Sequence, residues 1–220
     1  MNNREPLSHD ETLAVLAYVI FAVAAYQFGL KAMNTFLAET PKDLTSRMVE
    51  GIGVLLFIGL ARRRILSVRD LGNCFRAGNK ASALRSLLIC AGIVLGFVAA
   101  RLVLQPYRPE IAARPFFALY LDVGARAYYP LVALVQEVLA KGVVLMLFVR
   151  ICGSRHPILP ILLSSLLFGT LHMGYSLGYM FAATALCFFT GFLYRKDGNI
   201  WGCAAIHFLV GFLPRCFGLK

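Results

Sequence analysis

Long apolar stretches alternate with short polar connections along the chain. Most of the stretches approach the roughly 20 apolar residues that a helix needs to cross the hydrocarbon core of a bilayer. The longest, 156–194, carries no Asp, Glu, Lys or Arg and is interrupted by Gly and Ser around 173–178. The pattern therefore predicts an all-α polytopic transmembrane helix bundle of about seven spans. The predicted spans are 12–30, 48–61, 86–104, 127–149, two within 156–194, and 199–213.

Composition supports this fold class. Of the 220 residues, 59% are hydrophobic and only 15% are charged, which is far from the composition of a soluble domain. Because the spans consume nearly all of the chain, we predict one integral membrane domain over residues 1–220. The six cysteines form no CxxC pair, so neither a disulfide framework nor a zinc cluster is indicated.

The net charge of +11 does not point to nucleic acid in a chain this apolar. Basic residues that flank spans set the orientation of a membrane protein, and more of them fall on the predicted side of the N-terminus. We therefore expect the N-terminus to be cytoplasmic. The basic segment 62–85 fits an interfacial amphipathic helix or a solvated loop, and Arg101 is expected to extend its charged end toward the bilayer surface.

Ionisable side chains inside the predicted spans are the candidate chemistry. Glu137 and Lys141 lie in the fourth span, four residues apart, and so can pair on one helix face. The fifth and seventh spans each carry one histidine, His172 and His207. Charges at bilayer depth are expensive, so such residues mark functional sites by default. The structural alternatives are that Glu137 and Lys141 form an ion pair that only stabilises helix packing, and that the histidines form hydrogen bonds with backbone carbonyls.

Together, these side chains predict hydrolysis of a peptide bond. A carboxylate that faces one or two imidazoles can hold a water, take its proton and pass it to a leaving amine. We expect Glu137, His172 and His207 to do this without a cofactor. A zinc ion bound by the same three residues is a minor alternative, although the HExxH spacing is absent. A transporter that uses Glu137 as a proton relay is a further alternative, but no internal repeat supports it.

Three short motifs in residues 127–213 resemble those of the CAAX-protease and bacteriocin-processing (CPBP, Abi-type) family. They are QEVLAKG at 136–142, FGTLH at 168–172, and GNIW at 198–201 leading to His207. The resemblance implies an intramembrane glutamic endopeptidase with its motif-bearing core in the last four spans. By position, it implies that His172 is the partner of the catalytic base and that His207 is an oxyanion donor. Phe168 opens the second motif and has a supporting role.

The motifs depart from the family pattern at three positions. Gln136 stands in place of the first glutamate, Lys141 in place of an arginine, and Gly211 in place of the final asparagine. Either Glu137 has taken over as the base, or the protein is a catalytically inactive relative that acts as a peptide-binding or immunity factor. A glutamine amide cannot accept a proton at neutral pH.

From these features we predict an enzyme that processes or sorts exported proteins. Its partners are the lipid bilayer and a membrane-associated peptide or protein substrate, and not nucleic acid. We expect a multi-pass location in a bacterial inner (cytoplasmic) membrane.

Overall fold

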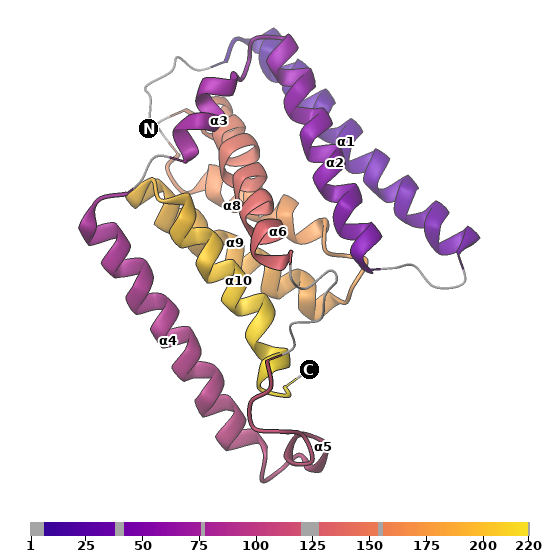
Figure 1. Ribbon diagram of the computed structural model, residues 1–220. Helices are drawn as coiled ribbons and strands as arrows, with labels where there is room; N and C mark the ends of the chain where they lie inside the picture. Colours follow the sequence, from indigo (N-terminus) through magenta and orange to yellow (C-terminus); the bar gives the residue numbers. More distant parts are fainter. Residues whose placement is uncertain (1–6, 38–41, 76–77, 120–127, 154–155, 220) are drawn as a thin grey trace. The chain divides into compact units, whose positions relative to one another are not determined.

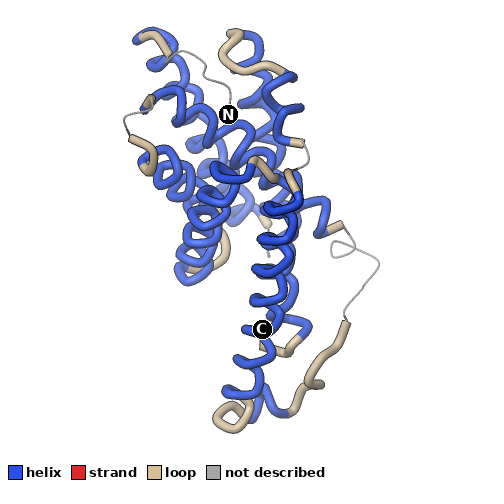
Figure 2. Tube along the Cα trace, turned by 90° about the vertical axis from the view of Figure 1, so that its left-hand side faces the viewer, coloured by secondary structure: helices blue, strands red, loops and turns tan. Residues whose placement is uncertain are grey.

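The computed structural model describes residues 7–37, 42–75, 78–119, 128–153 and 156–219 (Figure 1). Over these ranges the regular structure is helical and no strand occurs (Figure 2). The all-α prediction is therefore confirmed. The longer helices are α1 His9–Phe36, α2 Lys42–Arg62, α4 Lys80–Leu104, α8 Leu159–Thr170, α9 Leu177–Asp197 and α10 Ile200–Cys216. The shorter ones are α3 Val68–Cys74, α5 Pro109–Ala112, α6 Tyr129–Glu137, the π-helix η1 Val138–Leu145, and α7 Met146–Cys152.

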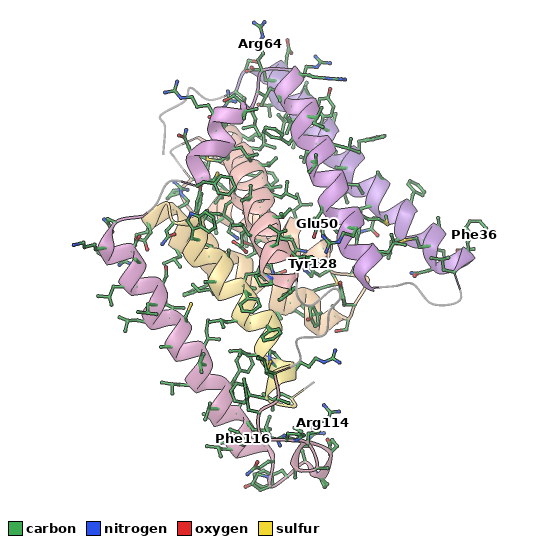
Figure 3. All side chains as sticks on the ribbon, in the orientation of Figure 1. Phe36, Glu50, Arg64, Arg114, Phe116 and Tyr128 are labelled. Carbon is green, nitrogen blue, oxygen red and sulfur yellow. The ribbon has the colours of Figure 1, made fainter. Side chains whose placement is uncertain are left out.

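Four helical segments in the described ranges are long and apolar enough to cross a membrane. They are His9–Phe36, Lys80–Leu104, Tyr129–Cys152 and Leu177–Asp197, while α8 and α10 are shorter apolar helices. Exposed apolar side chains are numerous on α1, α4 and α9. Phe36, for example, is 84% exposed and projects from the end of α1 (Figure 3). The chain is thus a helical membrane protein with candidate spans, whereas the total of seven stays a prediction.

The helix ends follow from local sequence. Ser8 caps α1 in a reciprocal arrangement with Glu11, and Ser176 caps α9 by accepting from the Tyr179 N–H. Gly198 ends α9 in the left-handed conformation that glycine adopts without strain, at φ 63°. Asn199 then caps α10 by accepting from the Gly202 N–H at 3.1 Å. The third motif of the sequence is therefore the turn that starts α10.

Packing divides the chain into two compact units. Unit 1 comprises Met1–Arg76 and Val138–Gly198, and unit 2 comprises Ala77–Glu137 and Asn199–Lys220. The single domain over 1–220 stays a prediction. The predicted fourth span crosses this division, and its first residue, Ala127, lies outside the described residues.

Two buried apolar clusters lie among the described residues of unit 1. The first joins α1, α2, η1 and α7 through Val15, Leu56, Leu60, Ile65, Leu66, Val143 and Leu147. The second joins η1, α8 and α9 through Ala140, Phe168, Ala183 and Cys187. Gly169 permits the close approach of α8 to α9, because a Cβ there would overlap the Thr184 hydroxyl and lie 3.0 Å from the Met180 carbonyl oxygen.

In unit 2, α10 packs against α4 and α6. Arg101 of α4 corrects one expectation, because its side chain is 1% exposed rather than extended toward the bilayer surface. Its guanidinium donates to the carbonyls of Ile111 and Arg114 and lies 5.9 Å from the centre of the Phe116 ring, beside α5 (Figure 3). These carbonyl partners offset the cost of burying the charge. The arginine thereby ties the segment that follows α4 to the end of that helix.

Candidate functional site

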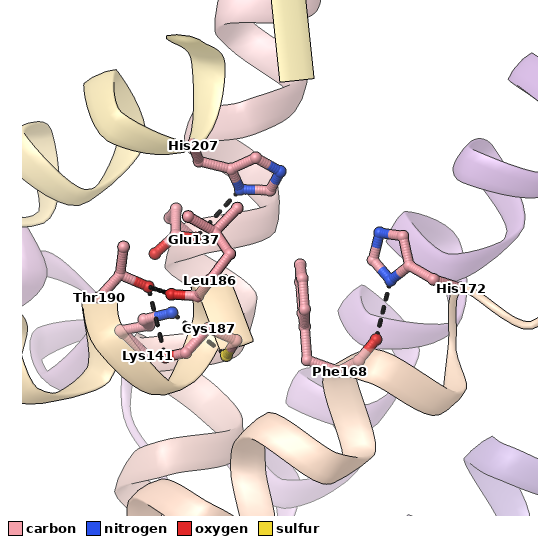
Figure 4. A network of polar contacts seen from close by, with 8 residues as sticks. All are labelled: Glu137, Lys141, Phe168, His172, Leu186, Cys187, Thr190 and His207. Atoms are coloured by element: carbon pink, nitrogen blue, oxygen red, sulfur yellow. Dashed lines mark hydrogen bonds and ion pairs between the residues drawn. The ribbon is translucent and has the colours of Figure 1, made fainter. Parts of the chain in front are cut away.

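Glu137 and His207 meet within unit 2. Glu137 is the last residue of α6 and His207 lies in the middle of α10. The Oε1 atom of Glu137 lies 3.0 Å from the Nδ1 atom of His207 (Figure 4). Glu137 is 0% exposed and His207 is 5% exposed. A buried carboxylate is costly unless it is paired, and the imidazole supplies that partner.

The Glu137–His207 contact fixes which nitrogen of the imidazole carries the proton. An ionised carboxylate can only accept hydrogen bonds, so Nδ1 of His207 donates and carries the proton in the neutral ring. The lone pair then lies on Nε2, on the far side of the ring from Glu137 (Figure 4). A carboxylate that holds a histidine in this tautomer also stabilises the imidazolium that forms when Nε2 takes a proton. The pair can therefore accept a proton and return it.

The widened helix after Glu137 is the second feature of this region. The chain passes from α6 into the π-helix η1, which contains Lys141 and Gly142 of the first motif. Such π-helical insertions are rare and often occur at functional sites. Lys141 is 1% exposed, and its Nζ atom lies 3.3 Å from Sγ of Cys187 and 6.0 Å from the centre of the Phe168 ring. The ion pair between Glu137 and Lys141 stays a prediction.

His172 lies in unit 1, in the turn after α8. Its Nδ1 atom is 2.8 Å from the carbonyl oxygen of Phe168, and the two rings are 4.7 Å apart (Figure 4). A carbonyl oxygen only accepts, so Nδ1 of His172 carries the proton and Nε2 is the basic nitrogen. The Tyr26 hydroxyl of α1 donates to the Leu171 carbonyl at 2.7 Å and anchors the start of this turn. The second motif thus orients one half-buried histidine.

The remaining predicted residues lie close to the Glu137–His207 pair in sequence. Gln136 is half-buried beside Glu137 on α6, about 100° round the helix. Gly211 follows His207 by four residues on α10. Glu137 and His207 could supply two ligands of the zinc alternative, while its third ligand, His172, belongs to unit 1, so this alternative stays a prediction.

Tyr129 is a neighbour of His207 that the ionisable residues of the spans did not indicate. Its ring lies edge-on to the His207 ring, with centroids 6.5 Å apart and an interplanar angle of 84°. It also contacts Phe208, at 6.0 Å between ring centroids. Its position eight residues before Glu137 places it on the same broad face of α6, which was a usable signal in the sequence.

The described residues thus hold helices that can span a membrane, a buried carboxylate–imidazole pair in unit 2 and an oriented histidine in unit 1. Comparison with protein families identifies the class of one part of the chain. Residues 123–213 match the family described as Rce1-like, type II CAAX prenyl endopeptidase. This part of the chain is a CPBP-family domain, which confirms the resemblance carried by the three motifs. Searches of the curated proteins and of the solved structures gave no match.

Proposed function

We propose that the protein is an intramembrane endopeptidase that hydrolyses a peptide bond of a membrane-associated protein or peptide. The family of residues 123–213 is one of proteases, which supports the reaction class. The observation that carries the proposal is the buried 3.0 Å contact between Glu137 and His207. This contact supplies a carboxylate although Gln136 stands at the usual position of the base.

The proposed reaction needs no covalent intermediate. Nε2 of His207 removes a proton from water while the oxygen attacks the scissile carbonyl carbon, and Glu137 stabilises the resulting imidazolium. The C–N bond then breaks, and the imidazolium returns the proton to the leaving amine. The products are a new carboxyl terminus and a new amino terminus, and the histidine ends in its starting state.

His172 is proposed as the second imidazole of the reaction. Its second-motif position matches that of the partner of the base in the family, and the Phe168 carbonyl leaves Nε2 as its basic nitrogen. Nε2 is therefore the nitrogen of His172 that is left to bind a reacting group. Alignment of a reacting group contributes strongly to rate, so loss of this imidazole should be severe.

Replacement of His172 by alanine should abolish cleavage of a membrane-tethered peptide by the purified protein in lipid vesicles. His156→Ala is the matched control, because His156 is exposed in a loop. Product termini identified by mass spectrometry give the readout. Cleavage by His172→Ala at the parental rate would contradict this assignment.

The membrane setting of the reaction is part of the proposal. We infer about seven spans, a cytoplasmic N-terminus and a bacterial inner membrane, with processing or sorting of exported proteins as the role. The four candidate spans and the exposed apolar side chains of α1 and α4 support insertion in a bilayer. Phe28 of α1, 77% exposed, and Leu95 of α4, 67% exposed, are examples.

A second candidate function is that of an inactive relative that binds a membrane peptide without cutting it, as a peptide-binding or immunity factor. Gln136 favours it, because its amide cannot take the role of a carboxylate base at neutral pH. For this candidate, the parent protein should retain a membrane-tethered peptide and release no new terminus. Cleavage by the parent therefore separates the two functions.

A further inference from the structure

We propose that the Tyr129 hydroxyl is a catalytic hydrogen-bond donor that stabilises the oxyanion formed during peptide hydrolysis. The inference rests on the proposed function and adds a residue to its site. The starting observation concerns Gly211. A Cβ atom on Gly211 would overlap Oη of Tyr129 and lie 2.7 Å from its Cζ atom. The phenol therefore occupies the space that any side chain at position 211 would fill.

The packing of α6 against α10 brings the Tyr129 ring beside His207, with the ring centroids 6.5 Å apart. Tyr129 and Glu137 lie on one broad face of α6, and Gly211 and His207 lie one turn apart on one face of α10. Tyr129 meets Gly211, while Glu137 meets His207. The two helices thus run antiparallel here. All four residues belong to unit 2, so the arrangement is internal to one compact unit.

Ring contacts hold the phenol in place. The Tyr129 ring is edge-on to His207 and tilted against Phe208, and its side chain is half-buried. The phenol ordinarily keeps its proton at neutral pH, so it serves as a donor rather than as a base. A donor aimed at developing negative charge in a partly dry site contributes more in the transition state than in the ground state. The Tyr129 hydroxyl of α6 thus takes the place of the donor that a side chain at residue 211 of α10 would have supplied.

The direct test is Tyr129→Phe, which keeps the ring contacts and removes the donor. Loss of one oxyanion donor lowers kcat by about 10²–10³-fold, with KM changed little because the substrate is bound before the charge forms. Tyr128→Phe is the matched control, since the neighbouring tyrosine is 62% exposed, and it should cleave at the parental rate. A purely structural tyrosine would not separate kcat from KM in this way.

A second pair of variants tests whether a hydrogen-bond donor at residue 211 can replace the donor at residue 129. Gly211→Asn alone should lower cleavage, because its side chain collides with the phenol. Tyr129→Ala clears that space, so Tyr129→Ala/Gly211→Asn should cleave at least about tenfold faster than Tyr129→Ala.

The outcomes separate this inference from the proposed function. Parental kcat in Tyr129→Phe overturns the inference and leaves the Glu137–His207 mechanism in place. A rise in KM with unchanged kcat also overturns it, since the phenol would then bind substrate in the ground state. If the parent does not cleave, the proposed function fails, and the inference fails with it.

Discussion

Replacement of Glu137 by glutamine should lower kcat for a membrane-tethered peptide by about 10²–10⁴-fold, the usual contribution of a positioned acid–base group. The amide has the shape of the carboxylate but no charge, so it cannot stabilise the His207 imidazolium. It can also offer its N–H₂ to Nδ1, which favours the wrong tautomer of the ring. The measurement is the initial cleavage rate at saturating substrate in vesicles.

Glu110→Gln is the matched control for this prediction. Glu110 is exposed and lies 3.4 Å from Arg108 at the start of α5, away from the Glu137–His207 pair in sequence and in fold. The same substitution there should leave kcat unchanged. Parental activity in Glu137→Gln would show that the Glu137 carboxylate takes no part in the proton transfer by His207.

The second prediction with a large effect is that the losses in kcat from substitution of Glu137 and of His207 are not additive. His207→Ala should reduce kcat as severely as Glu137→Gln, because each substitution destroys one proton-transfer unit. Residues that act as a unit show grossly non-additive losses, so Glu137→Gln/His207→Ala should be little slower than the slower single variant. Independent residues would instead multiply their losses.

Kinetics of the parent, both single variants and the double variant form a cycle that measures this coupling. Folding is monitored by thermal unfolding of the same preparations, because truncation of a buried partner leaves the other group unpaired. Multiplicative losses in folded variants would contradict a single carboxylate–imidazole unit.

Much of the helical fold could be predicted because apolar length is a strong signal. The uncharged stretch 156–194 indicated two helices broken around 173–178, and the structure has α8 and α9 with a turn over 171–176. The boundaries were less predictable. The second helix begins at Lys42 rather than near residue 48, and α4 begins at Lys80, inside the basic segment assigned to an interface or loop. Among the described residues of that segment, α3 is the helix that lies wholly within it.

The π-helix could not be predicted from the hydropathy pattern. The fourth stretch is apolar throughout, so its pattern does not distinguish α-helical from π-helical hydrogen bonding. The structure changes from α6 to η1 immediately after Glu137 and returns to an α-helix at Met146. In the structure η1 packs against α2, α3, α8 and α9, and these tertiary contacts are not visible in a hydropathy pattern.

The candidate site, like the fold, could be predicted only in part from the sequence. Charge in an apolar span was enough to single out Glu137 and His207, but not to show which partner each residue contacts. Spacing favoured Lys141 as a partner of Glu137, which stays a prediction, and it could not indicate the contact of Glu137 with His207, 70 residues away. From the sequence, Gly211 indicated the loss of an oxyanion donor. The sequence does not show that the Tyr129 side chain fills the space beside Gly211.

The most direct test of the central claim, that Glu137 rather than residue 136 provides the carboxylate, is the cleavage rate of the parent beside Gln136→Glu/Glu137→Gln. Both are measured in the same vesicles with the same tethered peptide. The double variant moves the carboxylate by one residue, about 100° round α6 and away from Nδ1 of His207. We predict cleavage by the parent and its loss in the double variant. Cleavage by the double variant together with no cleavage by the parent would contradict the claim.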